Sequence, residues 1–222
     1  MPTPFDSDRT SSAFDGLNVV HRPGLADQMM QELAPLLAAE GIDMNNPESF
    51  DLETLNAAMA RAVDRRNFEL FVATGERLSY ARTILRSFTE VVGAGDRELA
   101  EGIIWSVEPE PADQDVASVA HVIGVSAGLV DSWLSTPDLA AQLRKIVVPA
   151  WGSHGRAAAA DILALARKAR AFDSIGALHR QHSGLAIVEG GALAVAGTLI
   201  ALSKAQNREL GEVAAEMLGS EG

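Results

Sequence analysis

Apolar residues recur at intervals of three, four or seven along most of the chain, the spacing that places them on one face of an α-helix. One such run holds Leu78, Ala81, Leu85, Phe88 and Val92, and similar runs cover residues 25–39, 52–70, 99–107 and 139–147. No stretch alternates between apolar and polar residues in the way a half-buried strand does. The pattern therefore predicts an all-α fold, a multi-helix bundle of about nine to eleven helices.

The apolar periodicity is interrupted most clearly at residues 108–115, EPEPADQD, where two prolines lie among acidic residues. Proline disfavours helical backbone at the residue before it and ends most helices. This segment predicts a boundary between two subdomains. The expected organisation is a disordered lead at 1–22, an N-terminal helical subdomain at 23–107, an acidic linker at 108–115 and a C-terminal helical subdomain at 116–222.

The most apolar stretch, GLAIVEGGALAVAGTLIAL at residues 184–202, is nearly long enough to cross a membrane. It contains Glu189, however, and several glycines that would let neighbouring helices approach closely. We therefore predict a buried, Gly-rich apolar helix near the C-terminus, and no membrane partner. Glu189 would lie at the rim of the core or pair with a base from residues 167–180.

Residues 116–135 carry small and apolar residues at the positions where two short helices would cross. Counted from the first residue of that range, Ala120 is fifth, Gly124 ninth, Val130 fifteenth and Trp133 eighteenth. In this spacing the segment resembles the helix-turn-helix unit of the phage-repressor and lac-repressor type. The resemblance implies a turn at Gly124, with the other three residues packing the two helices together.

In that class the exposed positions of the second helix contact DNA or another macromolecule. Here those positions are Ser126, Ala127, Gly128, Asp131, Ser132 and Ser135. None carries a long hydrogen-bond donor, and the charge of Asp131 has the wrong sign for a phosphate backbone. Arg144 and Lys145, one helix further on, are the nearest bases that could flank a contact surface.

The overall charge also opposes nucleic acid binding. The chain has 18 Lys and Arg against 30 Asp and Glu, a net charge of −12. DNA remains possible but is disfavoured by this charge, so the expected partner is another protein or a second copy of the chain, as a homodimer. The absence of cysteine excludes disulfides and thiolate sites, and the N-terminal residues lack a signal-peptide pattern, which favours a cytoplasmic location.

Toward the C-terminus, the side chains that could bind a ligand or take part in a reaction are those of His179, His182 and Glu189. We consider them candidates for a ligand pocket. The two histidines are three apart and would share a helix face. Glu189 lies seven residues beyond, roughly 10 Å along a helix, too far to complete a metal site. We find no nucleophile motif and no phosphate-binding glycine loop, so no catalytic residue, metal or cofactor is predicted.

The sequence favours a cytoplasmic helical regulatory or interaction protein, one associated with transcription through the helix-turn-helix-like unit. The alternative is a helical small-molecule-binding protein or hydrolase with a pocket near His179, His182 and Glu189. The two hypotheses differ in what they bury. A regulator presents residues 126–135 to solvent, whereas a ligand-binding protein encloses a cavity.

Overall fold

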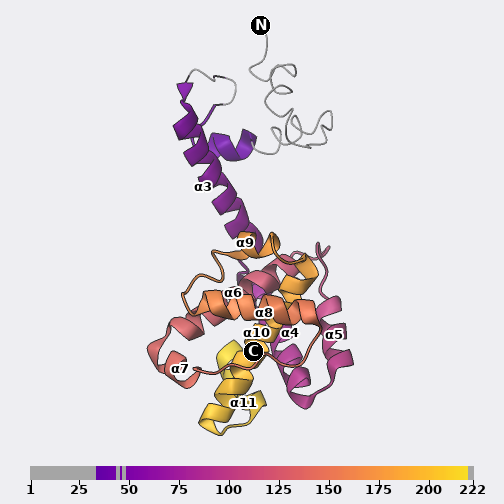
Figure 1. Ribbon diagram of the computed structural model, residues 1–222. Helices are drawn as coiled ribbons and strands as arrows, with labels where there is room; N and C mark the ends of the chain where they lie inside the picture. Colours follow the sequence, from indigo (N-terminus) through magenta and orange to yellow (C-terminus); the bar gives the residue numbers. More distant parts are fainter. Residues whose placement is uncertain (1–33, 44–45, 47–48, 220–222) are drawn as a thin grey trace. The chain divides into compact units, whose positions relative to one another are not determined.

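The computed structural model describes residues 34–43, 46 and 49–219, apart from the side chains of residues 63, 64 and 66–68. Throughout this part of the chain every regular element is helical and there is no strand (Figure 1). Residues 34–39 are helical, and the labelled helices are α3 (Leu52–Phe71), α4 (Gly75–Ala94), α5 (Arg97–Trp105), α6 (Val119–Ser135), α7 (Pro137–Gln142), α8 (Ser153–Ala166), α9 (Ile175–His179), α10 (Gly184–Gln206) and α11 (Leu210–Leu218). The predicted all-α fold is confirmed.

Short-range interactions set several of the helix ends. Asp51 accepts a hydrogen bond from the backbone N–H of Thr54 at 2.7 Å, so α3 begins at the next residue after a capping side chain. Asp96 caps α5 in the same way. Thr136 precedes Pro137, which occupies the first position of α7, where its missing N–H has no consequence.

The chain divides into two compact units, Met1–Arg66 and Asn67–Gly222, here called the N-terminal and C-terminal units. In the described part of the N-terminal unit, Leu37, Ile42 and Ala58 form a small buried cluster. Glu40 accepts hydrogen bonds from Arg61 at 2.6 Å and from Arg65 at 2.5 Å. The predicted lead at residues 1–22 lies outside the described residues.

The division at residues 66 and 67 differs from the boundary predicted at 108–115. That segment lies inside the C-terminal unit, and helices on both sides of it contribute to one core. Phe88 of α4 and Ile104 of α5 belong to the same buried cluster as Val122 of α6 and Leu193 of α10. The prolines end a helix as expected, but the helices before and after them bury their apolar faces against each other.

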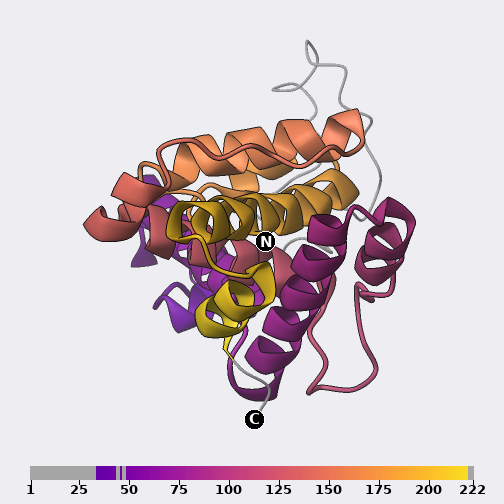
Figure 2. The same cartoon turned by 90° about the horizontal axis from the view of Figure 1, so that it is seen from below.

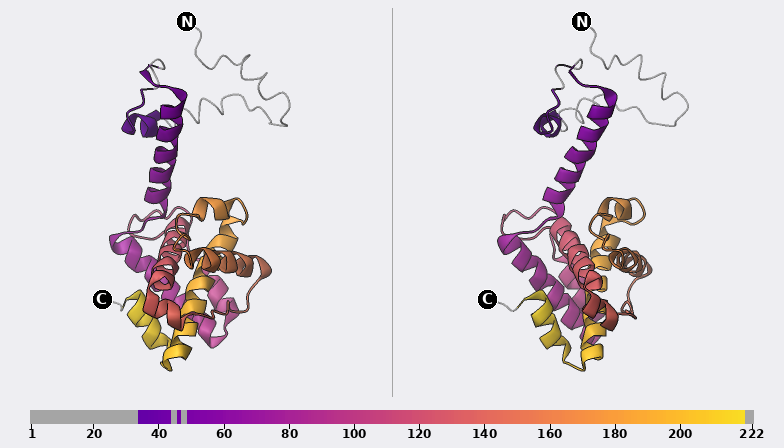
Figure 3. Two further views of the ribbon diagram at one scale, coloured as in Figure 1. Left: turned by 60° about the vertical axis from the view of Figure 1, so that its left-hand side comes forward. Right: turned by 90° about the vertical axis from the view of Figure 1, so that its left-hand side faces the viewer.

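The buried apolar helix near the C-terminus is confirmed as α10. It packs against α8 on one side and against α4 and α11 on the other (Figure 2), while α11 also lies beside α4 (Figure 3). A Cβ added at Gly190 would lie 2.6 Å from the Cβ of Ala158, and one added at Gly191 would lie 2.9 Å from that of Ser126. The glycines are therefore the reason that α8 and α6 approach α10 so closely. By length and composition α10 could also cross a membrane, but most of it is buried within the unit.

The turn predicted at Gly124 is wrong, because α6 runs as one helix from Val119 to Ser135. The Ser126 hydroxyl donates to the carbonyl oxygen of Val122 at 2.7 Å, a bond made inside the helix. The helix instead begins after Ser118, whose hydroxyl and backbone N–H exchange hydrogen bonds with His121 in a capping box.

The backbone at Phe71 explains why position 124 is occupied by a glycine. A Cβ at this position would overlap the backbone carbonyl oxygen of Phe71 and lie 2.7 Å from its carbon. Val130 and Trp133 are buried, as the helix-turn-helix spacing required, and Ala120 is half-buried. Apolar spacing along one long helix thus imitates the spacing of two short ones.

Candidate ligand pocket

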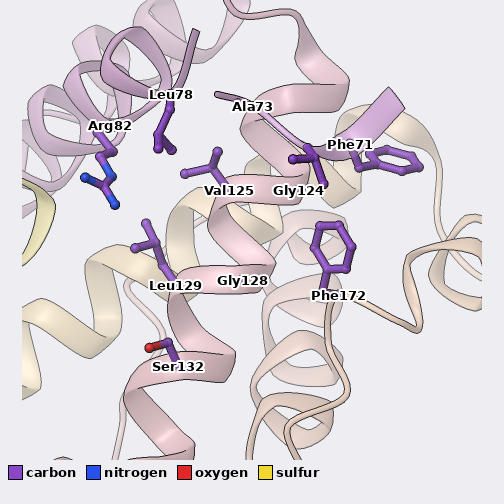
Figure 4. A pocket seen from close by; sticks show the side chains of 11 residues that line it. Phe71, Ala73, Leu78, Arg82, Gly124, Val125, Gly128, Leu129, Ser132 and Phe172 are labelled. Atoms are coloured by element: carbon purple, nitrogen blue, oxygen red, sulfur yellow. The ribbon is translucent and has the colours of Figure 1, made fainter. Parts of the chain in front are cut away.

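A cavity of about 320 Å³ opens in the C-terminal unit between α6, the first turns of α4, and the segment that joins α3 to α4 (Figure 4). Its lining residues come from four separate stretches of sequence. They are Phe71, Val72, Ala73, Leu78, Arg82, Gly124, Val125, Gly128, Leu129, Ser132 and Phe172. All of them belong to the C-terminal unit.

Helix α6 supplies one continuous wall of the pocket. Val125, Gly128, Leu129 and Ser132 follow the helical spacing of three, four and seven, so they share the face that borders the cavity. A Cβ added at Gly128 would meet no atom within 4 Å, whereas one at Gly124 would strike Phe71. The absence of a side chain at Gly128 therefore leaves space that nothing else in the described structure fills.

Two phenylalanines contribute aromatic walls to the pocket. Phe71 lies at the end of α3, where its backbone packs on α6 and its ring centroid is 6.1 Å from that of His179. Phe172 is held by Asp131, whose two carboxylate oxygens accept hydrogen bonds of 2.9 Å from the backbone N–H groups of Ala171 and Phe172. Asp131 therefore fixes the chain that carries one wall of the pocket.

Arg82 is the only charged residue among the described residues that line the cavity. Its Nε is buried and has no hydrogen-bond partner within the described structure. A buried donor without a partner costs about 1–3 kcal/mol, and more for a charged group. Such a group in a folded protein calls for an explanation, and an acceptor on a bound molecule is one.

Two of the residues predicted to contact DNA or a partner are buried. Ser126 is 0% exposed and Ala127 is 2% exposed, so neither can reach another molecule. Asp131 is engaged with the segment before α9, and Ser132 is exposed at the border of the pocket. The reason is that a continuous α6 lies against α10 and α4 as well as α8, which leaves little of its surface free.

The remaining partner-contact candidates lie at the end of α6 and beyond it. Ser135 is exposed, and its hydroxyl donates to the carbonyl oxygen of Ser132 at 3.1 Å. Arg144 and Lys145 are exposed in the stretch after α7. The carbonyl oxygen of Arg144 accepts a hydrogen bond of 3.3 Å from Arg167.

None of the three residues predicted to border a pocket is among those that line this cavity. His182 Nε2 lies 2.8 Å from a carboxylate oxygen of Asp161, which ties the start of α10 to α8. The ring of His179 lies beside that of Phe71, tilted by 32° to it, and Phe71 is one of the residues that line the cavity. Within the described residues no group of three or more His, Asp or Glu side chains could hold a metal ion.

Glu189 is half-buried, which agrees with a place at the rim of the core, but the base near it is not the predicted one. Burial raises the pKa of its carboxyl above the ordinary value of 4.5, while hydrogen bonding from Trp151 lowers it. The charge of Glu101 raises the pKa further, and the charge of Arg97 opposes it. The nearby base is thus Arg97 of α5, whose guanidinium lies 5.5 Å from the Trp151 ring centroid, and not a base from residues 167–180.

Sequence reasoning missed the pocket, although one signal of it is visible in the sequence. Leu78, Ala81 and Leu85 mark the buried stripe of α4, and Arg82 lies four residues after the first of them on the same side of the helix. A base at the edge of an apolar stripe indicates either a snorkelling side chain or a polar group placed toward a cavity.

Comparison with protein-family models, with curated protein sequences and with solved structures gives no match to this chain.

Proposed function

We propose that the C-terminal unit is a helical binding domain for a small, largely apolar molecule, and that the cavity beside α6 is its site. The observation that carries the proposal is the cavity itself, about 320 Å³ with two aromatic walls and one charged group. Small-molecule sites have volumes from about 300 to 1,000 Å³, are lined mainly by apolar and aromatic side chains, and contain a few polar groups that orient the ligand.

The proposal develops the second hypothesis drawn from the sequence, that of a small-molecule-binding protein, but it places the site elsewhere in the fold. Its residues lie around Phe71, Arg82 and Phe172, instead of around the predicted histidines and Glu189. The DNA-reading hypothesis has less support, because two of its predicted contact residues, Ser126 and Ala127, are buried. A regulatory role for the whole protein is compatible with ligand binding, since a bound molecule stabilises the conformation that binds it.

Binding of a neutral, environment-sensitive dye such as Nile red tests the proposal directly. The decisive variant is Gly128→Leu, which places an isobutyl group in the open space of the pocket. Gly102→Leu is its matched control, because Gly102 lies in helix α5, does not line the pocket and also has no atom within 4 Å of an added Cβ.

Dye fluorescence should rise with the wild-type protein and with Gly102→Leu, and it should be strongly reduced with Gly128→Leu. Circular dichroism would establish that all three proteins have the same helix content. Equal dye binding by the two leucine variants would show that the cavity beside α6 is not the binding site, and the proposal would be abandoned.

A further inference from the structure

We infer that the ligand of this pocket is a small carboxylic acid with an apolar body, whose carboxylate pairs with Arg82. This inference rests on the proposed function and specifies the chemistry of the molecule that the site accepts. Three features of the pocket carry it: the Arg82 Nε that has no partner within the described structure, the absence of an acidic side chain among the described lining residues, and the apolar character of the remaining walls.

The first feature is the state of Arg82. Its guanidinium borders the cavity between Leu78 and Leu129 (Figure 4), and its Nε has no partner within the described structure. Arginine is always charged and presents donors in a planar fork that matches the two oxygens of a carboxylate. A neutral acceptor could take one of these donors, but only an anion would also compensate the charge.

The second feature is the sign of the charge at the pocket compared with that of the whole chain. The protein has a net charge of −12, yet the single charged residue that lines the cavity is a base. Some arginines of this acidic chain pair with carboxylates of the protein, as Arg97 does with Glu101 at 2.7 Å and Arg208 does with Glu216 at 2.6 Å. Arg82 has no such partner in the described part of the chain, so its positive charge is available to pair with an anionic group of a ligand.

The third feature is the body of the pocket. Phe71, Phe172 and Leu129 offer apolar and aromatic surface, and the open space above Gly128 extends it along α6. These walls favour an alkyl or aryl group, because transfer of apolar surface from water is favourable by roughly 25 cal/mol per Å². Polyvalent anions such as nucleotides would leave most of their charge without a partner in such a site.

The test compares two probes of equal chain length, octanoate and 1-octanol, by isothermal titration calorimetry with the full chain. The wild-type protein should bind octanoate more tightly than 1-octanol. In Arg82→Leu the affinity for octanoate should fall by at least about tenfold, the size expected for losing a hydrogen bond to a charged group. The affinity of this variant for 1-octanol should stay within about twofold of the wild-type value, because the apolar walls are retained.

Two further variants control the comparison. Arg156→Leu removes one positive charge from the exposed surface of α8, outside the pocket, and should leave both affinities unchanged. Arg82→Lys keeps the charge but loses the planar fork, so octanoate affinity should lie between those of the wild type and Arg82→Leu. This conservative variant also guards against the possibility that a leucine at position 82 alters the fold.

The outcomes separate the two proposals. If both probes bind the wild type equally and Arg82→Leu changes neither affinity, the carboxylate inference is overturned while the pocket stands. If Arg156→Leu weakens octanoate as much as Arg82→Leu does, the effect is one of overall charge and the inference is again overturned. If neither probe binds and Gly128→Leu also fails to change dye binding, both the inference and the proposed function are rejected.

Discussion

Substitution of alanine for Gly124 tests the packing on which the pocket depends. Alanine in place of glycine within a helix normally raises the free energy of unfolding by about 0.5–1 kcal/mol, because it restricts the unfolded backbone. At Gly124 the new Cβ would overlap the carbonyl oxygen of Phe71 and lie 2.7 Å from the carbonyl carbon. Either α6 or the Phe71 segment must therefore shift, and such overpacking costs about 1–3 kcal/mol.

The same substitution at Gly128, one turn further along α6, provides the comparison. Its Cβ would meet no atom within 4 Å, so only the backbone effect remains. Gly128→Ala should be more stable than the wild type by about 0.5–1 kcal/mol, and Gly124→Ala less stable by about 1–3 kcal/mol. The two single-residue variants should thus differ by about 1.5–4 kcal/mol, although both residues lie in the same helix.

Urea unfolding followed by tryptophan fluorescence measures this difference in the unit concerned. The chain has three tryptophans, Trp105, Trp133 and Trp151, and all lie in the C-terminal unit. With a urea dependence of about 1–3 kcal/mol per molar, the unfolding midpoints of the two variants should be separated by about 0.5–4 M. If Gly124→Ala proves as stable as the wild type, Phe71 does not pack on α6 as described.

Gly124→Asn distinguishes a continuous helix from a turn. Asparagine is tolerated where the backbone has positive φ, so at the turn of a helix-turn-helix it would be milder than alanine. In the interior of α6 its larger side chain makes the overlap with Phe71 worse and its helix propensity is lower. The asparagine variant should therefore be the less stable of the two, and the reverse order would favour the turn.

Three further predictions concern residues around the site and the core. Asp131→Ala should lower the free energy of unfolding by about 2 kcal/mol and weaken dye binding, because Phe172 loses its anchor. Burial raises the pKa of the Glu189 carboxyl, so ionisation of this group lowers the stability of the folded wild-type protein as pH rises. The stability of Glu189→Gln relative to the wild type should therefore increase between about pH 4 and pH 7. Burial and the charge of Arg77 lower the pKa of His121 below 6.5, so wild-type stability should fall as pH drops below this value, and His121→Gln should reduce that loss.

Each of these predictions has an outcome that would contradict it. Dye affinity unchanged in Asp131→Ala would mean that Phe172 keeps its place without the carboxylate. A stability difference between Glu189→Gln and the wild type that is the same at about pH 4 and pH 7 would show that Glu189 titrates alike in the folded and unfolded chain. For His121, the critical observation is the slope of stability between about pH 7 and pH 5, which should be steeper in the wild type than in His121→Gln.

The sequence by itself was sufficient to predict the helices and the burial of α10. These features depend on residues only a few positions apart. Apolar residues three and four apart define one helix face, and the Asp51 carboxylate accepts a hydrogen bond within the first turn of its own helix. The glycines of α10 also predicted close approach, because a missing side chain permits it whichever helix is the neighbour.

Only the tertiary structure decided what Gly124 is for and where a ligand could bind. A glycine is suited both to a turn and to a close contact with a helix, so the sequence alone does not distinguish them. In the structure Gly124 is required because the carbonyl group of Phe71, distant in sequence, lies against it. The pocket likewise joins Phe71, Arg82 and Phe172 to one face of α6. The periodicity of the sequence indicates which residues become buried. The cavity, however, exists because residues distant in sequence leave unfilled space where they pack together.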